Sequence, residues 1–231
     1  LRLYLLFLIL LCGYPVLPVE AQVKHQVIIF NDNFESDPSS HWTISRESTD
    51  PSTFVPRDWT WVHSLPDDSF GSAFFAPDPA APELCSAPAP GQIGVLLLES
   101  PTITVPGYIE GLFLSFSYWA SLEAGFDGGQ LMISVNGGPY VLVTSESDED
   151  NSFYNYILSP VEGNSARFGQ PAWSGALNFW QGTPVVLARY AQPGDTLGLR
   201  WDMSTDYCFG TDSGWYVDNV SVYTYFTHTD G

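Results

Sequence analysis

The chain has 231 residues, 45% of them hydrophobic and 15% aromatic, and it carries a net charge of −19 with a single lysine, Lys24. This length and apolar content suffice for one domain of β-sandwich size with a buried core. The charge leaves no basic patch for the phosphates of nucleic acid or for anionic lipid headgroups. We therefore exclude nucleic acid as a partner.

Residues 1–12 are almost wholly apolar, and Gly13 and two prolines interrupt the run. The Val19-Glu20-Ala21 tripeptide has the small-residue spacing that signal peptidase accepts. The apolar stretch is shorter than the ~20 residues that span a bilayer. We predict a secretory signal over 1–21 and a single secreted, extracellular domain over 22–231 without membrane insertion; an uncleaved anchor is the alternative.

Two cysteines remain after the signal, Cys85 and Cys208. In an oxidising compartment they are expected to form one disulfide. Two separate thiols are the alternative, because only geometry decides the pairing.

Residues 113–138 predict two adjacent strands of one sheet. Residues 112–119 alternate between two faces, and so do residues 130–135, as a half-buried strand requires. Asn136-Gly137 supplies the positive backbone angles of a tight hairpin turn into a third strand, 140–144. The intervening loop carries Glu123 and Asp127 among glycines, which makes it the first candidate for a bound ion.

Other apolar runs predict further short strands, and the segments between them predict loops. Residues 153–181 are rich in aromatics, glycine and proline, and predict a long loop region with at most short strands. Trp42, Trp59 and Trp61 are interpreted as core or loop anchors, with a sugar-stacking platform as the alternative. The further strands are expected over 26–31, 72–76, 94–98, 102–105, 185–188, 196–203 and 214–225.

The last predicted strand contains an acidic residue where an apolar one is expected. Asp218 shares its parity with Tyr216, Val220 and Val222, which places the carboxylate on the apolar face. A buried carboxylate must be paired, by a metal, an arginine or a hydrogen-bonded neighbour. The oxygen-rich segment 31–35 is its expected partner, and Ca²⁺ suits such ligands. A carboxylate held by backbone amides is the alternative.

Several motifs carry a family resemblance: FAPDPAAPELC, ESPTITVP, LSFSYWASLEAGFDGGQLMISVNGG, AWSG, YAQPGDTLGLRWDMSTD and GWYVDNVSVY. In this order they resemble the jelly-roll β-sandwich accessory domain of secreted bacterial peptidases of the immune inhibitor A type and, more distantly, MAM and reelin-type modules. The resemblance covers about residues 31–225. It implies an all-β fold, a two-sheet antiparallel jelly-roll sandwich that is galactose-binding-like or MAM-like.

The resemblance also implies calcium sites. One, where the first and last strands meet, maps onto Asn33, Glu35 and Asp218. A second, built from loops that follow strands, maps onto four acidic residues, Asp78, Glu123, Asp127 and Asp206. No peptidase domain precedes the sandwich here, so the chain is expected to be a free-standing module or a fragment.

The sequence argues against an enzyme. It has no HExxH and no GxSxG motif, and its four histidines lie in loops or near the ends. Paired acids such as Glu123 and Asp127 also occur in glycosidases, which need two acids ~5–10 Å apart, but acids among glycines more often bind calcium. The sequence predicts a secreted, non-catalytic, calcium-stabilised module for cell-surface adhesion or extracellular assembly, with a protein or glycan partner. A carbohydrate-binding module and a self-assembling filament subunit are the alternatives.

Overall fold

The computed structural model describes residues 22–52, 54–67, 70–78, 93–144, 153–161, 165–206 and 214–229. Over these ranges the chain forms strands and turns and is all-β. The predicted signal over 1–21 lies outside them. Within the described ranges, no helix has the length and hydropathy needed to cross a membrane.

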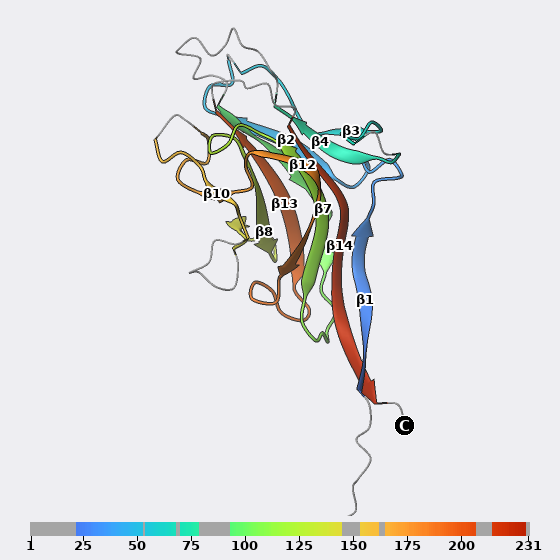
Figure 1. Ribbon diagram of the computed structural model, residues 1–231. Coiled ribbons are helices and arrows are strands. Elements are labelled where there is room, and N and C mark those ends of the chain that lie inside the picture. Colours follow the sequence, from blue (N-terminus) through green and yellow to red (C-terminus); the bar gives the residue numbers. More distant parts are fainter. Residues whose placement is uncertain are drawn as a thin grey trace, which may run out of the picture.

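Two antiparallel sheets form a jelly-roll sandwich (Figure 1). The first sheet has the order β12-β7-β14-β4-β3, and β1 pairs with the second half of β14. Its strands are β1 (Gln22–Asp32), β3 (Thr60–Val62), β4 (Ala73–Pro77), β7 (Phe113–Ser121), β12 (Ala176–Val186) and β14 (Gly214–Thr229).

The second sheet has the order β2-β5-β13-β8-β9, with β6 paired to β13. A separate pair, β10 with β11, lies in the segment that follows β9. These strands are β2 (Thr43–Ser48), β5 (Gly94–Glu99), β6 (Ile103–Thr104), β8 (Gly128–Val135), β9 (Val141–Leu142), β10 (Tyr156–Ile157), β11 (Pro171–Ala172) and β13 (Thr196–Thr205).

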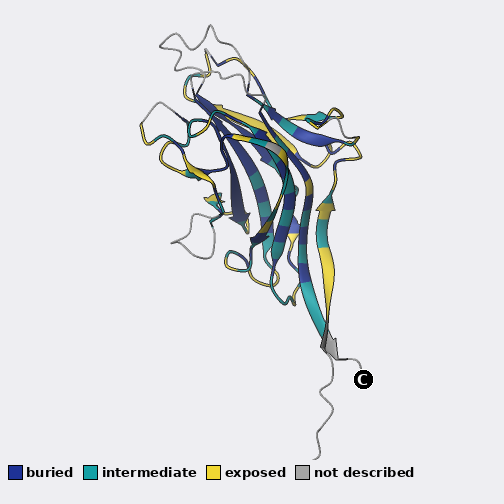
Figure 2. Ribbon diagram, in the orientation of Figure 1, coloured by how far each residue is buried: buried dark blue, intermediate teal, exposed yellow. Residues whose placement is uncertain are grey.

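The buried residues lie along the strands of the two packed sheets (Figure 2). The core that they form is rich in aromatic side chains. Phe116 of the first sheet makes an edge contact with Trp201 of the second, with ring centroids 5.5 Å apart. Trp42 and Trp59 are buried in the same cluster, and Trp61 is half-buried against it. The structure thus places these tryptophans in or against the core, which is one of the two anchor roles expected from the sequence. The predicted inward positions of β13 are confirmed too, since Leu197, Leu199, Trp201 and Met203 are all buried.

The predicted adjacency of the strands in 113–138 is wrong. The alternation within β7 is as expected, but β7 pairs with β12 and β14, whereas β8 pairs with β13 and β9. The loop 123–127 therefore crosses from one sheet to the other. Asn136 and Gly137 do adopt positive φ (53° and 71°), which turns the chain from β8 into the short β9. Alternation fixes which face of a strand is buried but not which strand lies beside it.

The expectation of at most short strands in 153–181 is also wrong. β12 is an eleven-residue edge strand that begins at Ala176 and pairs with β7. Its register shifts between Leu177 and Gln181, and it contains Pro184. A bulge and a proline are tolerated at a sheet edge, and both obscure the strand pattern in the sequence.

The prediction that Asp218 lies on the apolar face of the last strand is wrong. Trp215 and Val217 face the core, and the register of β14 against β7 shifts between Asp218 and Ser221. Asn219, with φ of 52°, forms this bulge. Because the bulge changes the phase, Asp218 pairs with Ser117, which belongs to the outward set of β7. Asp218 is buried, but on the outer side of its sheet.

β1 and the second half of β14 form a two-stranded ribbon that extends beyond the sandwich (Figure 1). The pairing brings residues 31–32 beside Val220 and Ser221, so the expected proximity of the two chain ends is confirmed. Residues 24–28 are exposed along the ribbon (Figure 2).

Candidate metal centre

The crossing loop between β7 and β8 is held by a compact set of backbone hydrogen bonds. The amides of Phe126 and Asp127 donate to the carbonyl of Glu123, both at 3.1 Å. Ser174 Oγ donates to the Asp127 carbonyl at 2.5 Å and accepts from the Gly125 amide at 2.8 Å. The loop is thus fixed before any ligand is considered.

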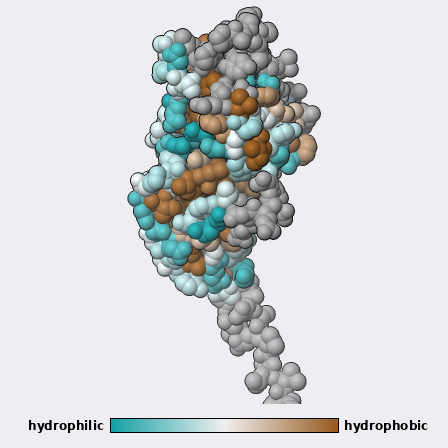
Figure 3. Space-filling view, turned by 90° about the vertical axis from the view of Figure 1, so that its left-hand side faces the viewer, coloured by the Kyte–Doolittle hydropathy of each residue, from teal (hydrophilic) through white to brown (hydrophobic). Residues whose placement is uncertain are grey.

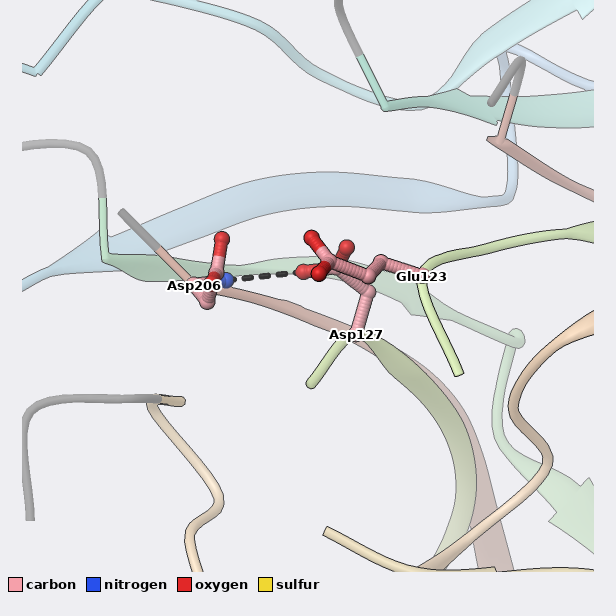
Figure 4. A group of neighbouring side chains, drawn as sticks. All are labelled: Glu123, Asp127 and Asp206. Carbon is pink, nitrogen blue, oxygen red and sulfur yellow. Dashed lines mark hydrogen bonds between the residues drawn. The ribbon is translucent and has the colours of Figure 1, made fainter. Parts of the chain in front are cut away.

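This loop brings three carboxylates to one point (Figure 4). Oxygen atoms of Glu123, Asp127 and Asp206 all lie within 4.8 Å of one another. Asp206 directly follows β13, and its amide donates to Asp127 Oδ1 at 2.8 Å. In the part of the chain that the structure describes, this is the one acidic group that gathers so tightly. The proximity of these three predicted residues is confirmed, while their role as metal ligands stays a prediction.

Of the three carboxylates, Asp127 is the one for which an isolated negative charge is least favourable. It is fully buried, and its Oδ2 atom accepts no hydrogen bond from the described residues. Burial raises the pKa of Asp127 well above its usual range, and the charges of Asp78 and Asp206 raise it further, against the opposing hydrogen bond from the Asp206 amide. The cluster therefore needs either protons or a cation.

The fourth predicted ligand, Asp78, lies just after β4 and is buried. Its charge acts on Asp127, so the structure brings it into the same neighbourhood. Arg57 also reaches this region: burial lowers the pKa of its guanidinium, and Asp78 and Asp127 oppose that effect. Its guanidinium donates to Thr205 Oγ1 at 2.8 Å and stacks over Phe54.

The donor chemistry fits a hard cation. The group offers carboxylate oxygens and, among the described residues, neither histidine nor cysteine. Ca²⁺ binds ~6–8 oxygens at about 2.4 Å, and oxygens within 4.8 Å of one another can share such an ion. Zn²⁺ prefers nitrogen and sulfur ligands. The residues present thus fit Ca²⁺.

The other predicted set, Asn33, Glu35 and Asp218, is looser. Both Asp218 oxygens accept hydrogen bonds from Asn219, at 2.6 and 3.0 Å, and Glu35 Oε1 accepts one from the Ser72 amide at 3.0 Å. Burial raises the pKa of Asp218 to about 6, with smaller contributions from the charges of Glu35 and Asp32 against the opposing backbone hydrogen bond of Asn219. These hydrogen bonds agree with the alternative expected from the sequence, in which backbone amides hold the carboxylate. Calcium here stays a prediction.

The aromatic residues of 153–181 differ in how far they are buried. Tyr154 and Trp173 are buried in the core, whereas Tyr156 and Phe179 are exposed on different strands, β10 and β12. Cys85 and Cys208 lie outside the described residues, so their disulfide stays a prediction.

Sequence reasoning missed Arg57 and Ser174. Arg57 lies in a polar stretch without hydrophobic periodicity, so nothing in the sequence marked it as a residue of the site. Ser174 lies in the AWSG motif, which was noted as a family signature but not as the residue that fixes the loop carbonyls of Glu123 and Asp127.

No protein-family model and no curated protein matches the sequence. Solved structures resemble the fold remotely. The enzymatically active domain of tailspike protein 4 from bacteriophage CBA120 is 16% identical (85% of this chain, 20% of that chain, TM-score 0.39). The module TmCBM61, solved with beta-1,4-galactotriose, is 10% identical (81% and 88%, TM-score 0.39).

A third similar structure is the K1 cleaved adhesin domain of Lys-gingipain from Porphyromonas gingivalis, which is 14% identical (90% and 99%, TM-score 0.36). The chain spans about one fifth of the tailspike chain and nearly all of the other two. The jelly-roll assignment itself rests on the strand order and register of the two sheets.

Proposed function

We propose that this chain is a secreted, non-catalytic β-sandwich module that binds a partner at the cell surface and is stabilised by Ca²⁺. One observation carries the calcium part: Glu123, Asp127 and Asp206 converge within 4.8 Å around a fully buried Asp127. The resemblance of the strand motifs to accessory domains of secreted peptidases supports the same class of protein.

An ion at this point would join elements that are distant in sequence. The loop 123–127 connects the two sheets, and Asp206 directly follows β13, which lies in the middle of the second sheet. Calcium would therefore fix one end of the sandwich and the loops that leave it. Binding to the folded state alone adds stability by mass action.

Burial also argues against glycoside hydrolysis at these acids. Asp127 and Asp206 are 0% and 3% exposed, so a sugar cannot reach them. Their oxygens are also closer than the ~5–10 Å that separates the two acids of most glycosidases. We infer a structural role for this cluster.

The test is thermal unfolding of the protein in chelator and in excess calcium. At free calcium about a hundredfold above Kd, the stabilisation is ~2.7 kcal/mol, which raises the unfolding midpoint by about 5–10 °C for a domain of this size. Asp127→Asn should abolish the shift. Asp58→Asn, which alters an exposed carboxylate paired with Arg46, should retain it.

An unchanged wild-type midpoint across the calcium titration would remove the calcium part of the proposal. An equal shift in Asp127→Asn and wild type would place the ion elsewhere.

Self-assembly is a second candidate, favoured by one observation. β1 pairs only with β14 among the described strands, so its other edge is open, and Val27 and Ile28 are 40% and 51% exposed. An open edge can accept a strand from another copy. Light scattering of wild type and Ile28→Lys tests this: assemblies in the wild type should be lost in the variant, and a monomeric wild type contradicts it.

A further inference from the structure

The outer face of the second sheet is hollowed at one end. The hollow has a volume of about 560 Å³ and opens between the beginning of β2, the end of β5 and the beginning of β13. The residues that matter for its chemistry are Thr43, Glu99, Ser134, Tyr140, Thr196 and Gly198. Gly198 at this end lies eight residues along the chain from Asp206 of the acidic cluster, and Ser134 lies seven residues from Asp127, which is about 24–27 Å at ~3.4 Å per residue.

The hollow exists because the rest of this face is covered and Gly198 is small. Gln130, which points outward from β8, donates to the Pro171 carbonyl at 2.8 Å, and Arg167 donates to Asp202 at 2.8 Å. The segment 165–171 thus covers the other end. A Cβ atom at Gly198 would lie 2.9 Å from Tyr140 Oη, so any larger residue would intrude on the tyrosine.

The charges at the hollow are mutually neutralised. Arg200 lies between Glu99, at 3.7 Å, and Asp202, at 2.6 Å, and its guanidinium stacks on the Tyr140 ring at 4.2 Å. An anionic ligand is disfavoured by the net charge of −19. A bare cation is disfavoured because Glu99 already shares its charge with Arg200.

The remaining polar lining groups are hydroxyls, one carboxylate, the phenol of Tyr140 and the imidazole of His41, whose Nε2 atom lies 3.2 Å from Asp32 Oδ2. Ser134 Oγ already donates to the Gly138 carbonyl at 2.6 Å and Thr196 Oγ1 to Asn136 Oδ1 at 3.4 Å, so these two hydroxyls offer a ligand their acceptor lone pairs. A hydroxyl such as that of Thr43 can both donate and accept hydrogen bonds. Tyr140 Oη donates to Glu99 Oε2 at a long 3.4 Å, so both groups keep capacity for another partner. Burial raises the pKa of Tyr140 to about 12, so the phenol keeps its proton at neutral pH.

We propose that this hollow binds a neutral sugar unit of a glycan, with Tyr140 as the aromatic wall and Glu99 as the acceptor for sugar hydroxyls. A sugar offers many hydroxyls and no charge, which matches a concave site with a few converging polar groups. Figure 3 shows one side of the molecule, on which hydrophilic and hydrophobic residues are intermingled. This inference rests on the proposed role as a binding module and names its ligand class.

The test uses the full chain and a panel of neutral hexose oligosaccharides with their sulfated counterparts, followed by calorimetry with the best binder. Tyr140→Ala should weaken binding at least about tenfold, as should Gly198→Gln, which fills the hollow. Tyr108→Ala, at a 61% exposed tyrosine elsewhere, is the matched control and should bind like wild type.

Each variant is first checked for a wild-type unfolding midpoint, and Tyr140→Leu, which removes the ring but keeps an apolar side chain, replaces Tyr140→Ala if that variant is unstable. Absence of binding to every neutral oligosaccharide overturns the inference. Binding restricted to sulfated glycans, or binding within twofold of wild type in both Tyr140→Ala and Gly198→Gln, overturns it as well. Because calcium stabilisation is read from unfolding and sugar binding from calorimetry, failure of one proposal is distinguishable from failure of the other.

Discussion

The buried carboxyl group of Asp218, where the first and last strands meet, should make the stability of the protein depend on pH. Its pKa is raised from 3.8 to about 6, chiefly by burial. A shift of about two units at ~1.36 kcal/mol each sets an upper bound near 3 kcal/mol. Screening by solvent at the sheet surface reduces this to about 1–2 kcal/mol.

The sign follows from linkage. Because the folded state binds the proton more tightly, stability is lost as pH rises from about 4 to about 6. Asp218→Asn cannot ionise and does not suffer this loss. In calcium-free buffer, the stability of the variant relative to wild type should therefore improve by about 1–2 kcal/mol between pH ~4 and pH ~7.

Urea unfolding of both proteins at the two pH values measures this difference. Any hydrogen bond to Asn219 that the variant loses lowers its stability at both pH values alike and cancels in the comparison. A pH-independent difference, or a change of opposite sign, would refute the reasoning. If Asn33, Glu35 and Asp218 bind calcium, adding calcium at pH ~7 should stabilise the wild type but not Asp218→Asn. The wild type should then become the more stable of the two proteins.

Three further outcomes are expected. The pKa of Asp195 is lowered by the hydrogen bonds from Asn136 and the Gln192 amide, so Asp195→Asn should destabilise the protein at neutral pH, and the loss should fade as the pH falls through the lowered pKa of the folded state. Urea unfolding at neutral and acidic pH checks this, and an equal loss at acidic pH would contradict it. A Cβ at residue 129 would lie 2.7 Å from the buried Trp215 indole, so Gly129→Ala should cost about 1–3 kcal/mol by overpacking, and an unchanged urea midpoint would contradict it. Tyr154→Phe leaves buried backbone groups without the tyrosine hydroxyl, and should cost about 1–3 kcal/mol in chemical denaturation; a neutral effect would mean that water replaces the hydroxyl.

The sequence predicted the faces of strands better than their neighbours. The buried positions of β7 and β13 follow from period-two alternation, and the Asn136-Gly137 turn follows from its residue types. The placement of β7 and β8 in different sheets does not, because pairing depends on contacts between distant segments. The edge strand β12 was hidden by its bulge and its proline.

The candidate site was predictable in part for a similar reason. Glu123 and Asp127 stand out as acids among glycines, but the arrival of Asp206 depends on β13 pairing with β8 across the second sheet. The resemblance supplied that residue, whereas periodicity did not. For Asp218 the alternation was misleading, because the bulge at Asn219 shifts the phase of the strand by one residue.

The most direct measurement is anomalous diffraction from crystals grown with calcium. We predict a peak between Glu123, Asp127 and Asp206, with carboxylate oxygens about 2.3–2.6 Å from the ion. A map without a peak there, with the three carboxyls hydrogen-bonded to one another as protonated acids, would contradict the calcium centre.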